Sequence, residues 1–224
     1  MRLLDLFCGA GGAAMGYYRA GFDEIVGVDL APQPRYPFTF VQGDALEYAL
    51  LEGSGFDAIH ASPPCQHYSR LRHLPWLKHR TYWDSIPPTL EVLGLVEIPW
   101  VVENVEDSPL GGVTLCGQFF GLPIFRHRRF RASFPLVQPV HTKHSGVIAV
   151  GSASMATRYR AGNIGVKELN RDSIGGHFAG VARGRAAMGI PWMTCDELSQ
   201  AIPPAYTEYI GRQLLQHLRR EVVA

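Results

Sequence analysis

Residues 3–12 read Leu-Leu-Asp-Leu-Phe-Cys-Gly-Ala-Gly-Gly, and this stretch decides the fold of the chain. Leu3 to Phe7 has the apolar composition of a short buried strand, and residues 13–20, after the glycines, predict a helix. A strand, a glycine turn and a helix in succession let backbone N–H groups approach a ligand closely. The spacing differs from the dinucleotide-binding fingerprint, so this turn needs support from the strands that follow it.

Two further strand patterns end at acidic residues. Residues 24–28 are followed by Asp29, and residues 38–42 are followed by Gly43 and Asp44. An acid at the end of the second strand is well placed to accept hydrogen bonds from ribose hydroxyls. Either aspartate alone is more often a helix N-cap or a turn residue. Together with the glycine turn, these strand ends predict a nucleoside-containing cofactor across the edge of the sheet.

A thiol follows the next strand pattern. Residues 61–69 read Ala-Ser-Pro-Pro-Cys-Gln-His-Tyr-Ser and come directly after the apolar stretch 56–60. Open α/β sheets keep their active sites at the carboxyl ends of their strands. Pro63 and Pro64 restrict the backbone, which predicts a stiff loop that holds a nucleophile at one angle. On Cys65 alone, a buried structural cysteine is an equally good interpretation.

A carboxyl group follows the strand pattern at residues 100–102. Glu103 lies at the end of this pattern, and parallel strands would place it beside Cys65. An acid in an apolar pocket stays protonated and can donate a hydrogen bond to a ring nitrogen. A lone glutamate at a strand end is usually a cap or a surface acid, so the pairing with Cys65 is what favours a site.

Two segments carry basic residues and no acid. Residues 66–80 combine arginines, lysine and histidines with Tyr68 and Trp76, a pattern typical of loops that grip phosphates and lie beside bases. A solvated loop is the alternative interpretation. The second segment supplies arginine forks suited to phosphates or carboxylates, namely Arg126, Arg128, Arg129 and Arg131.

Composition sets the remaining limits. With 224 residues, 46% hydrophobic and 18% charged, the chain predicts one domain, or one domain with an inserted lobe. A net charge of +1 excludes a protein that binds nucleic acid through overall charge, although a basic face is compatible with it. No run predicts a membrane span or a signal peptide. The four cysteines form no C-x-x-C pair, which predicts no metal site and a reduced, cytoplasmic setting: Cys8, Cys65, Cys116 and Cys195.

Taken in order, these stretches resemble the motifs of the C5-cytosine DNA methyltransferases over nearly the whole chain. The matching stretches are Asp5–Gly12, Pro64-Cys65-Gln66 with Ser69, Glu103-Asn104-Val105, Pro123–Phe130, Ala187–Pro191 and Ala201–Pro204. The resemblance implies an α/β, Rossmann-like methyltransferase fold that uses S-adenosyl-L-methionine. Its central sheet would be mostly parallel, with helices on both faces and a small inserted lobe.

The resemblance also assigns roles to residues. It implies that Cys65, Glu103, Arg126 and Arg128 are catalytic. The residues it implies for S-adenosyl-L-methionine are Asp5, Phe7, Cys8, Gly9, Gly11, Gly12, Asp29, Leu30, Asp44, Ala45, Pro64 and Gln200. Those it implies for the nucleic acid are Gln66, Ser69, Arg70, Arg72 and Arg129.

The implied reaction explains why these residue types go together. Cys65 as a thiolate adds to C6 of cytosine, which makes C5 nucleophilic towards a methyl group. Glu103 contacts N3 and the exocyclic amine, Arg128 holds the O2 side, and Arg126 orients Glu103 or a phosphate. The thiolate needs a depressed pKa, which the basic neighbours are suited to supply. A duplex hides C6, so the base is flipped out or already unpaired.

The chain departs from the family pattern at two places. Residues 1–131 would form the catalytic and cofactor-binding core and residues 186–224 the closing motifs, which leaves only 132–185 for target recognition. This short region predicts weak selectivity, a very short site, or a specificity partner or companion nuclease. The family usually has Gly-Asn-Ala or Gly-Asn-Ser where this chain has Ser199-Gln200-Ala201. Small enzymes of this kind resemble those carried by bacteriophages.

Other functions stay open at this point. RNA, single-stranded DNA or a free nucleotide would suit the short lobe, and the basic segments favour a polymer over a nucleotide. A non-catalytic nucleic-acid-binding relative would show decay at Cys65, Glu103 or the arginines, and all are intact. Transfer of a larger group from an altered cofactor has no positive sign. DNA is therefore the expected partner, and no membrane is expected.

Overall fold

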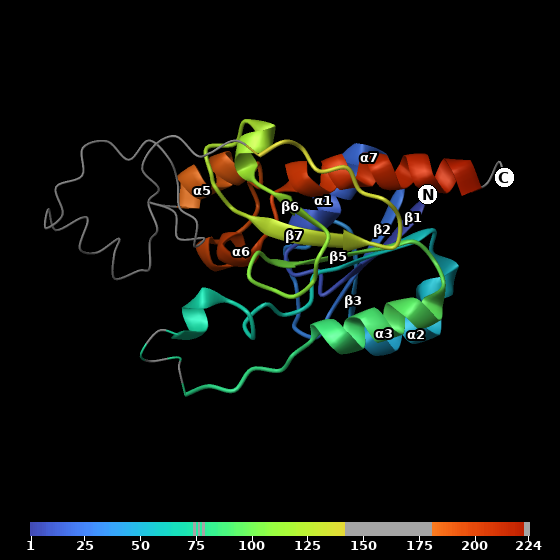
Figure 1. Cartoon of the computed structure of the whole chain (residues 1–224), viewed down its shortest axis with the longest axis horizontal. Coiled ribbons are helices and arrows are strands. Elements are labelled where there is room, and N and C mark those ends of the chain that lie inside the picture. The colour runs from blue at the N-terminus through green and yellow to red at the C-terminus, as the bar shows by residue number, and fades with distance from the viewer. Residues whose placement is uncertain (74, 76, 78, 142–180, 222–224) are drawn as a thin grey trace, which may run out of the picture.

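The computed structural model describes residues 1–73, 75, 77, 79–141 and 181–221. A seven-stranded sheet with the order β3-β2-β1-β4-β5-β7-β6 lies at its centre (Figure 1). The first five strands along the chain pair in parallel, while β7 is antiparallel to both β5 and β6. The strands are β1 (Arg2–Leu6), β2 (Glu24–Asp29), β3 (Thr39–Gln42), β4 (Ala58–Ala61), β5 (Trp100–Val105), β6 (Val113–Leu115) and β7 (Arg128–Ala132).

Helices cover both faces of this sheet. Figure 1 shows α1 (Gly12–Ala20) and α7 (Pro204–Glu221) on one side, and α2 (Ala45–Glu52) and α3 (Ile86–Val96) on the other. The shorter helices are α5 (Val181–Met188), α6 (Cys195–Gln200) and the 3-10 helices η1 (Gly53–Gly55), η2 (Arg70–His73) and η3 (Gly117–Phe120). The predicted fold class is therefore confirmed.

The central strands are buried on both faces, which explains their continuous apolar runs. Leu3 and Leu4 in β1 are both fully buried, but they join different core clusters because successive side chains point to opposite faces. Leu3 packs in the cluster that contains Tyr17 of α1 and Ile210 of α7. Leu4 packs in the cluster on the α2 and α3 side.

The last long helix packs closely against the helix that follows the glycine turn. A Cβ atom added at Gly16 would lie 2.0 Å from Oγ1 of Thr207, so only glycine allows this approach. Thr207 Oγ1 also donates a hydrogen bond to the carbonyl oxygen of Ala13 at 2.8 Å. The helix α7 is thus fastened to α1 by close packing and by a hydrogen bond.

The helix predicted at residues 13–20 agrees with α1 within one residue. Thr194 caps α6 in a capping box with Glu197. The antiparallel strands β6 and β7 were not predicted as elements. Residues 142–180, the greater part of the predicted target-recognition region, lie outside the described residues. Among the described helices, none has the length and apolar character needed to cross a membrane.

Candidate active site

The glycine turn opens the end of β1 towards a ligand. Phe7 has a φ of 55°, a left-handed conformation that costs a non-glycine residue about 1–3 kcal/mol. Gly9, with a φ of 48°, has open space where a Cβ atom would lie. Gly11 is the N-cap of α1, and no side chain caps the helix there. The first-turn N–H groups of α1 therefore face a position suited to polar ligand atoms.

Asp29 joins the end of β2 to this turn. Its Oδ2 accepts from the N–H of Gly9 and its Oδ1 from the N–H of Ala31, both at 3.0 Å. These bonds hold the carboxylate at the edge where a ribose was predicted. Leu30, the next residue, is 74% exposed. An aromatic ring lying over this edge would cover Leu30.

Two buried groups lie beneath the turn. Asp5 is fully buried, and its Oδ2 accepts from the hydroxyl of Tyr36 at 3.0 Å. Its Oδ1 has no hydrogen-bond partner among the described residues, and burial raises the pKa of this carboxyl well above its usual range. Burial also raises the pKa of the neighbouring Cys8 thiol. A buried oxygen with unused bonding capacity fits a site that a polar ligand completes.

Three predicted cofactor residues have structural roles as well. The Asp44 carboxylate is the N-cap of α2, where its Oδ1 accepts from the N–H groups of Leu46 at 2.8 Å and Glu47 at 3.0 Å. Ala45, the first residue of that helix, is buried. A Cβ atom at Gly12 would lie 2.6 Å from the carbonyl oxygen of Ile202. Packing against the segment that carries the closing motifs (residues 186–224, the closing segment) therefore requires this glycine.

The closing segment covers the glycine turn through contacts that the sequence did not indicate. Trp192 donates its indole N–H to the carbonyl oxygen of Ala10 at 2.8 Å. Arg35, which follows β2, forms a salt bridge of 2.8 Å with Glu197 of α6. Gln200 is exposed, and its Nε2 lies 3.5 Å from the hydroxyl of Ser199. No motif marked Trp192 or Arg35, because their partners lie more than 150 residues away.

The loop that carries Cys65 is held at both prolines. The side-chain amide of Asn104 donates to the carbonyl oxygen of Pro63, and the hydroxyl of Ser85 donates to that of Pro64, both at 3.0 Å. The carbonyl oxygen of Cys65 accepts from the N–H of Ser69 at 2.9 Å. The loop is fixed as predicted, although the sequence pointed to the prolines and not to Asn104 or Ser85.

Glu103 lies beside this loop at the end of β5. Its carboxylate is 8% exposed, and Oε1 lies 3.0 Å from Nε of Arg128 in a salt bridge. The antiparallel pairing of β5 with β7 brings the arginine there. Burial raises the pKa of Glu103, while the charges of Arg128 and Arg126 oppose the rise. The predicted pairing with Cys65 is consistent with the order of β4 and β5 in the sheet.

The Cys65 thiol does not have the depressed pKa that the sequence suggested. Burial raises its pKa, and the negative charge of Glu103 adds to the rise. Arg128 and Arg126 act in the opposite direction but do not outweigh burial. The two arginines and the glutamate are thus close enough to influence the thiol.

Arg126 is a buried cation. It is 1% exposed, its Nη2 donates to the carbonyl oxygen of Ser199 at 2.6 Å, and burial lowers its pKa to about 9. Its Nε has no partner among the described residues. Tyr206 of α7 donates its hydroxyl to the carbonyl oxygen of the same arginine. This burial is incompatible with the predicted phosphate contact. Arg126 instead connects the segment Pro123–Phe130, the arginine motif, to the closing segment.

The predicted nucleic-acid residues are divided between two environments. Gln66 is exposed, Ser69 is half-buried, and Arg72 donates to the carbonyl oxygen of His67. Arg129 points back to the protein and donates to the carbonyl oxygen of Ser108 at 3.2 Å. Arg70 lies in η2, and its side chain is outside the described set.

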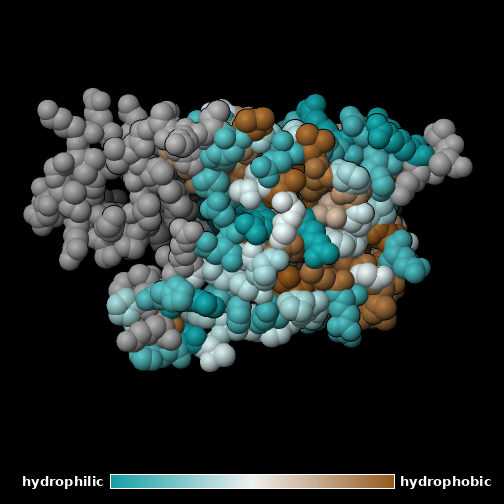
Figure 2. Space-filling view, viewed as in Figure 1, coloured by the Kyte–Doolittle hydropathy of each residue, from teal (hydrophilic) through white to brown (hydrophobic). Residues whose placement is uncertain are grey.

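The loop also forms a basic hollow of about 320 Å³, lined by His67, Arg72, His73, Arg80, Thr81 and Tyr82. Figure 2 shows a hydrophilic surface where this part of the chain projects from the body. The exposed side of the loop therefore has the polar and basic character that a phosphate backbone requires.

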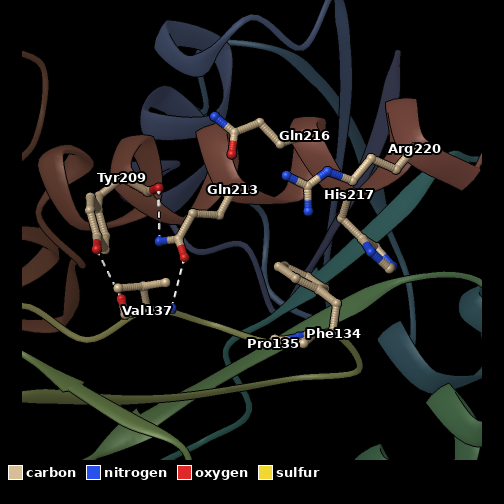
Figure 3. A pocket seen from close by; sticks show the side chains of 8 residues that line it. All are labelled: Phe134, Pro135, Val137, Tyr209, Gln213, Gln216, His217 and Arg220. Carbon is tan, nitrogen blue, oxygen red and sulfur yellow. Dashed lines mark hydrogen bonds between the residues drawn. The ribbon is translucent and has the colours of Figure 1, made fainter.

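A second hollow lies away from these residues. It has a volume of about 490 Å³ and is lined by Phe134, Pro135, Val137, Tyr209, Gln213, Gln216, His217 and Arg220 (Figure 3). Tyr209 donates to the carbonyl oxygen of Val137, and Gln213 accepts from the N–H of the same residue. These bonds fasten the segment after β7 onto α7. The hollow thus belongs to a packing contact and not to the candidate site.

Comparison with known proteins supports the arrangement. The model of the C-5 cytosine-specific DNA methylase family matches residues 1–80, which contain the glycine turn, Asp29 and the Cys65 loop. Residues 1–80 are therefore similar to this DNA methylase family. No curated protein matches the chain.

One solved structure shares the fold of the whole chain, and a second is similar to part of it. One is a protein assigned as a DNA modification methyltransferase encoded within a prophage, from E. coli. It is 15% identical with a TM-score of 0.60, and the match covers 98% of this chain and 99% of that one. A conserved hypothetical protein from Streptococcus pyogenes is 22% identical over 49% of this chain and 70% of its own, with a TM-score of 0.35. The first of these matches shows the same fold.

Proposed function

We propose that this protein is a DNA methylase that transfers a methyl group from S-adenosyl-L-methionine to C5 of cytosine in DNA through a covalent bond from Cys65 to C6. The observation that carries the proposal is the meeting of one thiol, one buried acid and two arginines where β4 and β5 end. Cys65, Glu103 and Arg128 come from three segments, and their charges act on one another. These groups suit attack by the thiol on C6 of a cytosine ring whose N3 accepts a proton from the acid.

The residues at the ends of β1 and β2 fit S-adenosyl-L-methionine. The uncapped start of α1 and the open side of Gly9 suit its polar amino-acid part. Asp29 suits the ribose hydroxyls, and exposed Leu30 suits the adenine ring. When bound, this cofactor supplies an electrophilic methyl group. Gly9, Asp29 and Leu30 would hold it beside the Cys65 loop.

The protein's own groups account for activation of the cytosine. Glu103, whose pKa is raised by burial, donates its proton to N3 and makes C6 electrophilic. The Cys65 thiol loses its proton to solvent, and its sulfur bonds to C6 while the ring electrons move towards C5. C5 then accepts the methyl group. Loss of the C5 proton to water, departure of Cys65 and return of the N3 proton to Glu103 restore the ring.

The two arginines have different tasks in this proposal. Arg128 keeps Glu103 oriented through the salt bridge of 3.0 Å and lies near enough to contact O2 of the base. Arg126, which is buried, stabilises the thiolate through its charge and holds the closing segment in place. Both cations favour the ionised thiol at the moment when Glu103 has given its proton to the base.

The acceptor is proposed to be a cytosine flipped from DNA, since C6 is hidden inside a duplex. The basic hollow beside Cys65 suits the phosphates that flank such a base. Residues 132–185 are proposed to form a short target-recognition region, which predicts a short or weakly selective site. A cytoplasmic location, where DNA and the cofactor are both present, is part of the same proposal.

The test is transfer of tritiated methyl from S-adenosyl-L-methionine to duplex DNA, single-stranded DNA, RNA and dCMP in parallel, with analysis of the product nucleoside. We expect 5-methylcytosine in duplex DNA. Incorporation into RNA or single-stranded DNA alone would keep the chemistry and change the acceptor. Incorporation only into dCMP, or into adenine, would reject the proposal.

A further inference from the structure

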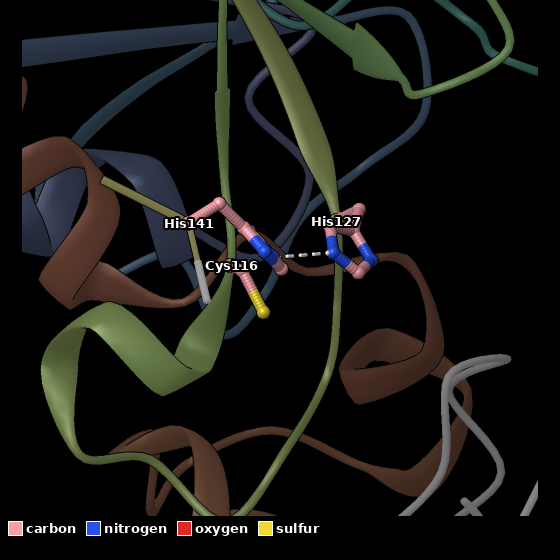
Figure 4. Close-up of side chains that lie close together, drawn as sticks. All are labelled: Cys116, His127 and His141. Carbon is pink, nitrogen blue, oxygen red and sulfur yellow. Dashed lines mark hydrogen bonds between the residues drawn. The ribbon is translucent and has the colours of Figure 1, made fainter. Parts of the chain in front are cut away.

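Three potential metal ligands lie close together at the arginine motif. Cys116 follows β6, His127 directly precedes β7, and His141 is the last described residue before position 142. Their ligand atoms, Sγ and one nitrogen of each imidazole, all lie within 4.8 Å of one another (Figure 4). The sequence predicted no metal site because the cysteines form no pair. The prediction did not consider one cysteine combined with two histidines that only the fold brings together.

The separation of the two histidines is close to that of a metal site. Nε2 of His127 lies 3.1 Å from Nε2 of His141, joined by a hydrogen bond in which only one nitrogen carries the hydrogen. Two imidazoles on a tetrahedral zinc ion, each about 2.0 Å from it, have nitrogens about 3.3 Å apart. Small side-chain rotations would turn the two lone pairs from each other towards a common ion.

A carboxylate lies on the other side of His127. Oε2 of Glu106 is 3.9 Å from Nδ1 of this histidine. A carboxylate in this position favours hydrogen on Nδ1 and leaves the Nε2 lone pair for a metal, which is the usual arrangement around metal-bound histidine. Glu106 would also offset the single positive charge that remains when Zn²⁺ binds one thiolate.

The chemistry of the ligands selects the metal. One thiolate and two imidazoles suit the borderline-soft Zn²⁺, whereas Mg²⁺ and Ca²⁺ require oxygen ligands. Cys116 is fully buried, His127 is partly buried and His141 is exposed, so an ion has access from the His141 side. Binding would release the Cys116 thiol proton to solvent and move the shared imidazole hydrogen to an Nδ1 position.

We propose that Cys116, His127 and His141 form a zinc site that holds the arginine motif in position. The ion would join the end of β6, the start of β7 and the first part of the predicted target-recognition region, where His141 lies. His127 stands between Arg126 and Arg128, so a metal bound to it restrains both arginines. The site is structural and has three protein ligands, with water completing the coordination.

The test is binding of Co²⁺ as a spectroscopic substitute for Zn²⁺, using the full chain freed of metal by a chelator and kept reduced. We expect one equivalent of Co²⁺ to produce thiolate-to-cobalt charge-transfer absorption in the near ultraviolet, and Zn²⁺ to abolish it. Cys116→Ser should remove this absorption. His141→Ala, a change at an exposed residue that leaves the core intact, should weaken Co²⁺ binding at least tenfold. Cys195→Ser, at an exposed thiol on α6, is the matched control and should bind as the unchanged chain does.

Two results would overturn the inference. One is the absence of charge-transfer absorption at saturating Co²⁺, and the other is equal binding by the unchanged chain and His141→Ala. Should Cys116→Ser fail to fold, the His141→Ala comparison still decides the matter. These measurements do not involve methyl transfer, so their outcome is independent of the proposed reaction.

Discussion

The proposed cofactor side of the site, around Asp29, and the proposed acceptor side, around Glu103, are built differently. On the cofactor side, backbone N–H groups and one carboxylate do the positioning, as the bonds from Gly9 and Ala31 to Asp29 show. On the acceptor side, charged side chains are buried together, as in the pair of Glu103 with Arg128. Backbone donors have a fixed geometry and keep no net charge. Buried charges shift one another's pKa values, and that is the property proton transfer requires.

The first variant separates the two sides by removing the nucleophile. Cys65→Ser should lower methyl transfer by at least about 10³-fold, because a serine hydroxyl is a much weaker nucleophile than a thiolate. The dissociation constant for S-adenosyl-L-methionine should change less than twofold, since the cofactor side is untouched. Radiometric turnover and calorimetric binding measure the two quantities. Cys195→Ser should retain most activity, and an equal loss in both variants would disprove the assignment of the nucleophile.

Glu103→Gln tests the proton donor. We expect kcat to fall by about 10²–10³-fold, since general acid catalysis contributes factors of this size. In the unchanged enzyme, activity should fall as pH rises through the raised pKa of Glu103, because the protonated acid is the active form. The variant should lose this decline at high pH. A pH profile of kcat checks this, with Glu91→Gln on the exposed side of α3 as the control. An unchanged profile in Glu103→Gln would contradict the role.

Asp29→Ala tests the cofactor side by itself. The variant loses a charged hydrogen-bond acceptor and the support of Gly9, so we expect the cofactor dissociation constant to rise about 10- to 100-fold. At saturating cofactor, kcat should stay within about threefold. Asp23→Ala, directly before the start of the same strand, should bind as the unchanged chain does. A large fall in kcat with an unchanged cofactor dissociation constant would contradict the assignment of Asp29 to cofactor binding.

The smallest expected effect is on stability and concerns His60, whose partner Ser62 lies in the loop that carries Cys65. His60 is fully buried between Tyr17, at 3.0 Å, and Ser62, at 2.8 Å, and burial lowers its pKa to about 3. Because this folded value is below the unfolded value of about 6.5, its stabilisation is complete above pH 6.5 and is lost as pH falls towards 3. Between pH 7.5 and 5.0 the loss is about 2 kcal/mol in the free energy of unfolding.

His60→Gln should remove this part of the pH dependence. Urea unfolding at pH 7.5 and 5.0 measures it, and exposed His73→Gln is the control. The difference between the two pH values should be about 2 kcal/mol smaller in His60→Gln than in the unchanged chain. Equal differences in the two variants would show that this histidine is not held in its neutral form.

The difference between the cofactor side and the acceptor side also explains which features could be predicted from the sequence. The glycine turn, Asp29 and the Cys65 loop depend on neighbouring residues, so local patterns indicated their strands and their place at the sheet edge. The capping of α2 by Asp44 was open in the sequence, because an N-cap and a ligand residue follow a strand in the same way. The structure adds the cap without excluding a ligand.

Contacts between distant segments were harder to predict. The burial of Arg126 depends on Ser199 and Tyr206, which lie more than 70 residues away, so a basic segment suggested a phosphate contact instead. The raised pKa of Cys65 has the same origin, since neighbouring charges can be counted in a sequence whereas burial cannot. The cluster around Cys116 arises only when β6 and β7 pair.

The most direct measurement of the central claim is covalent trapping with duplex DNA that contains 5-fluorocytosine. Fluorine at C5 cannot leave as a proton does, so the bond from sulfur to C6 should persist after methyl transfer. With S-adenosyl-L-methionine present, we predict a complex of protein and DNA that survives denaturation and whose DNA is attached to the peptide containing Cys65. The absence of this complex while the enzyme methylates ordinary DNA, or its formation by Cys65→Ser, would contradict the account.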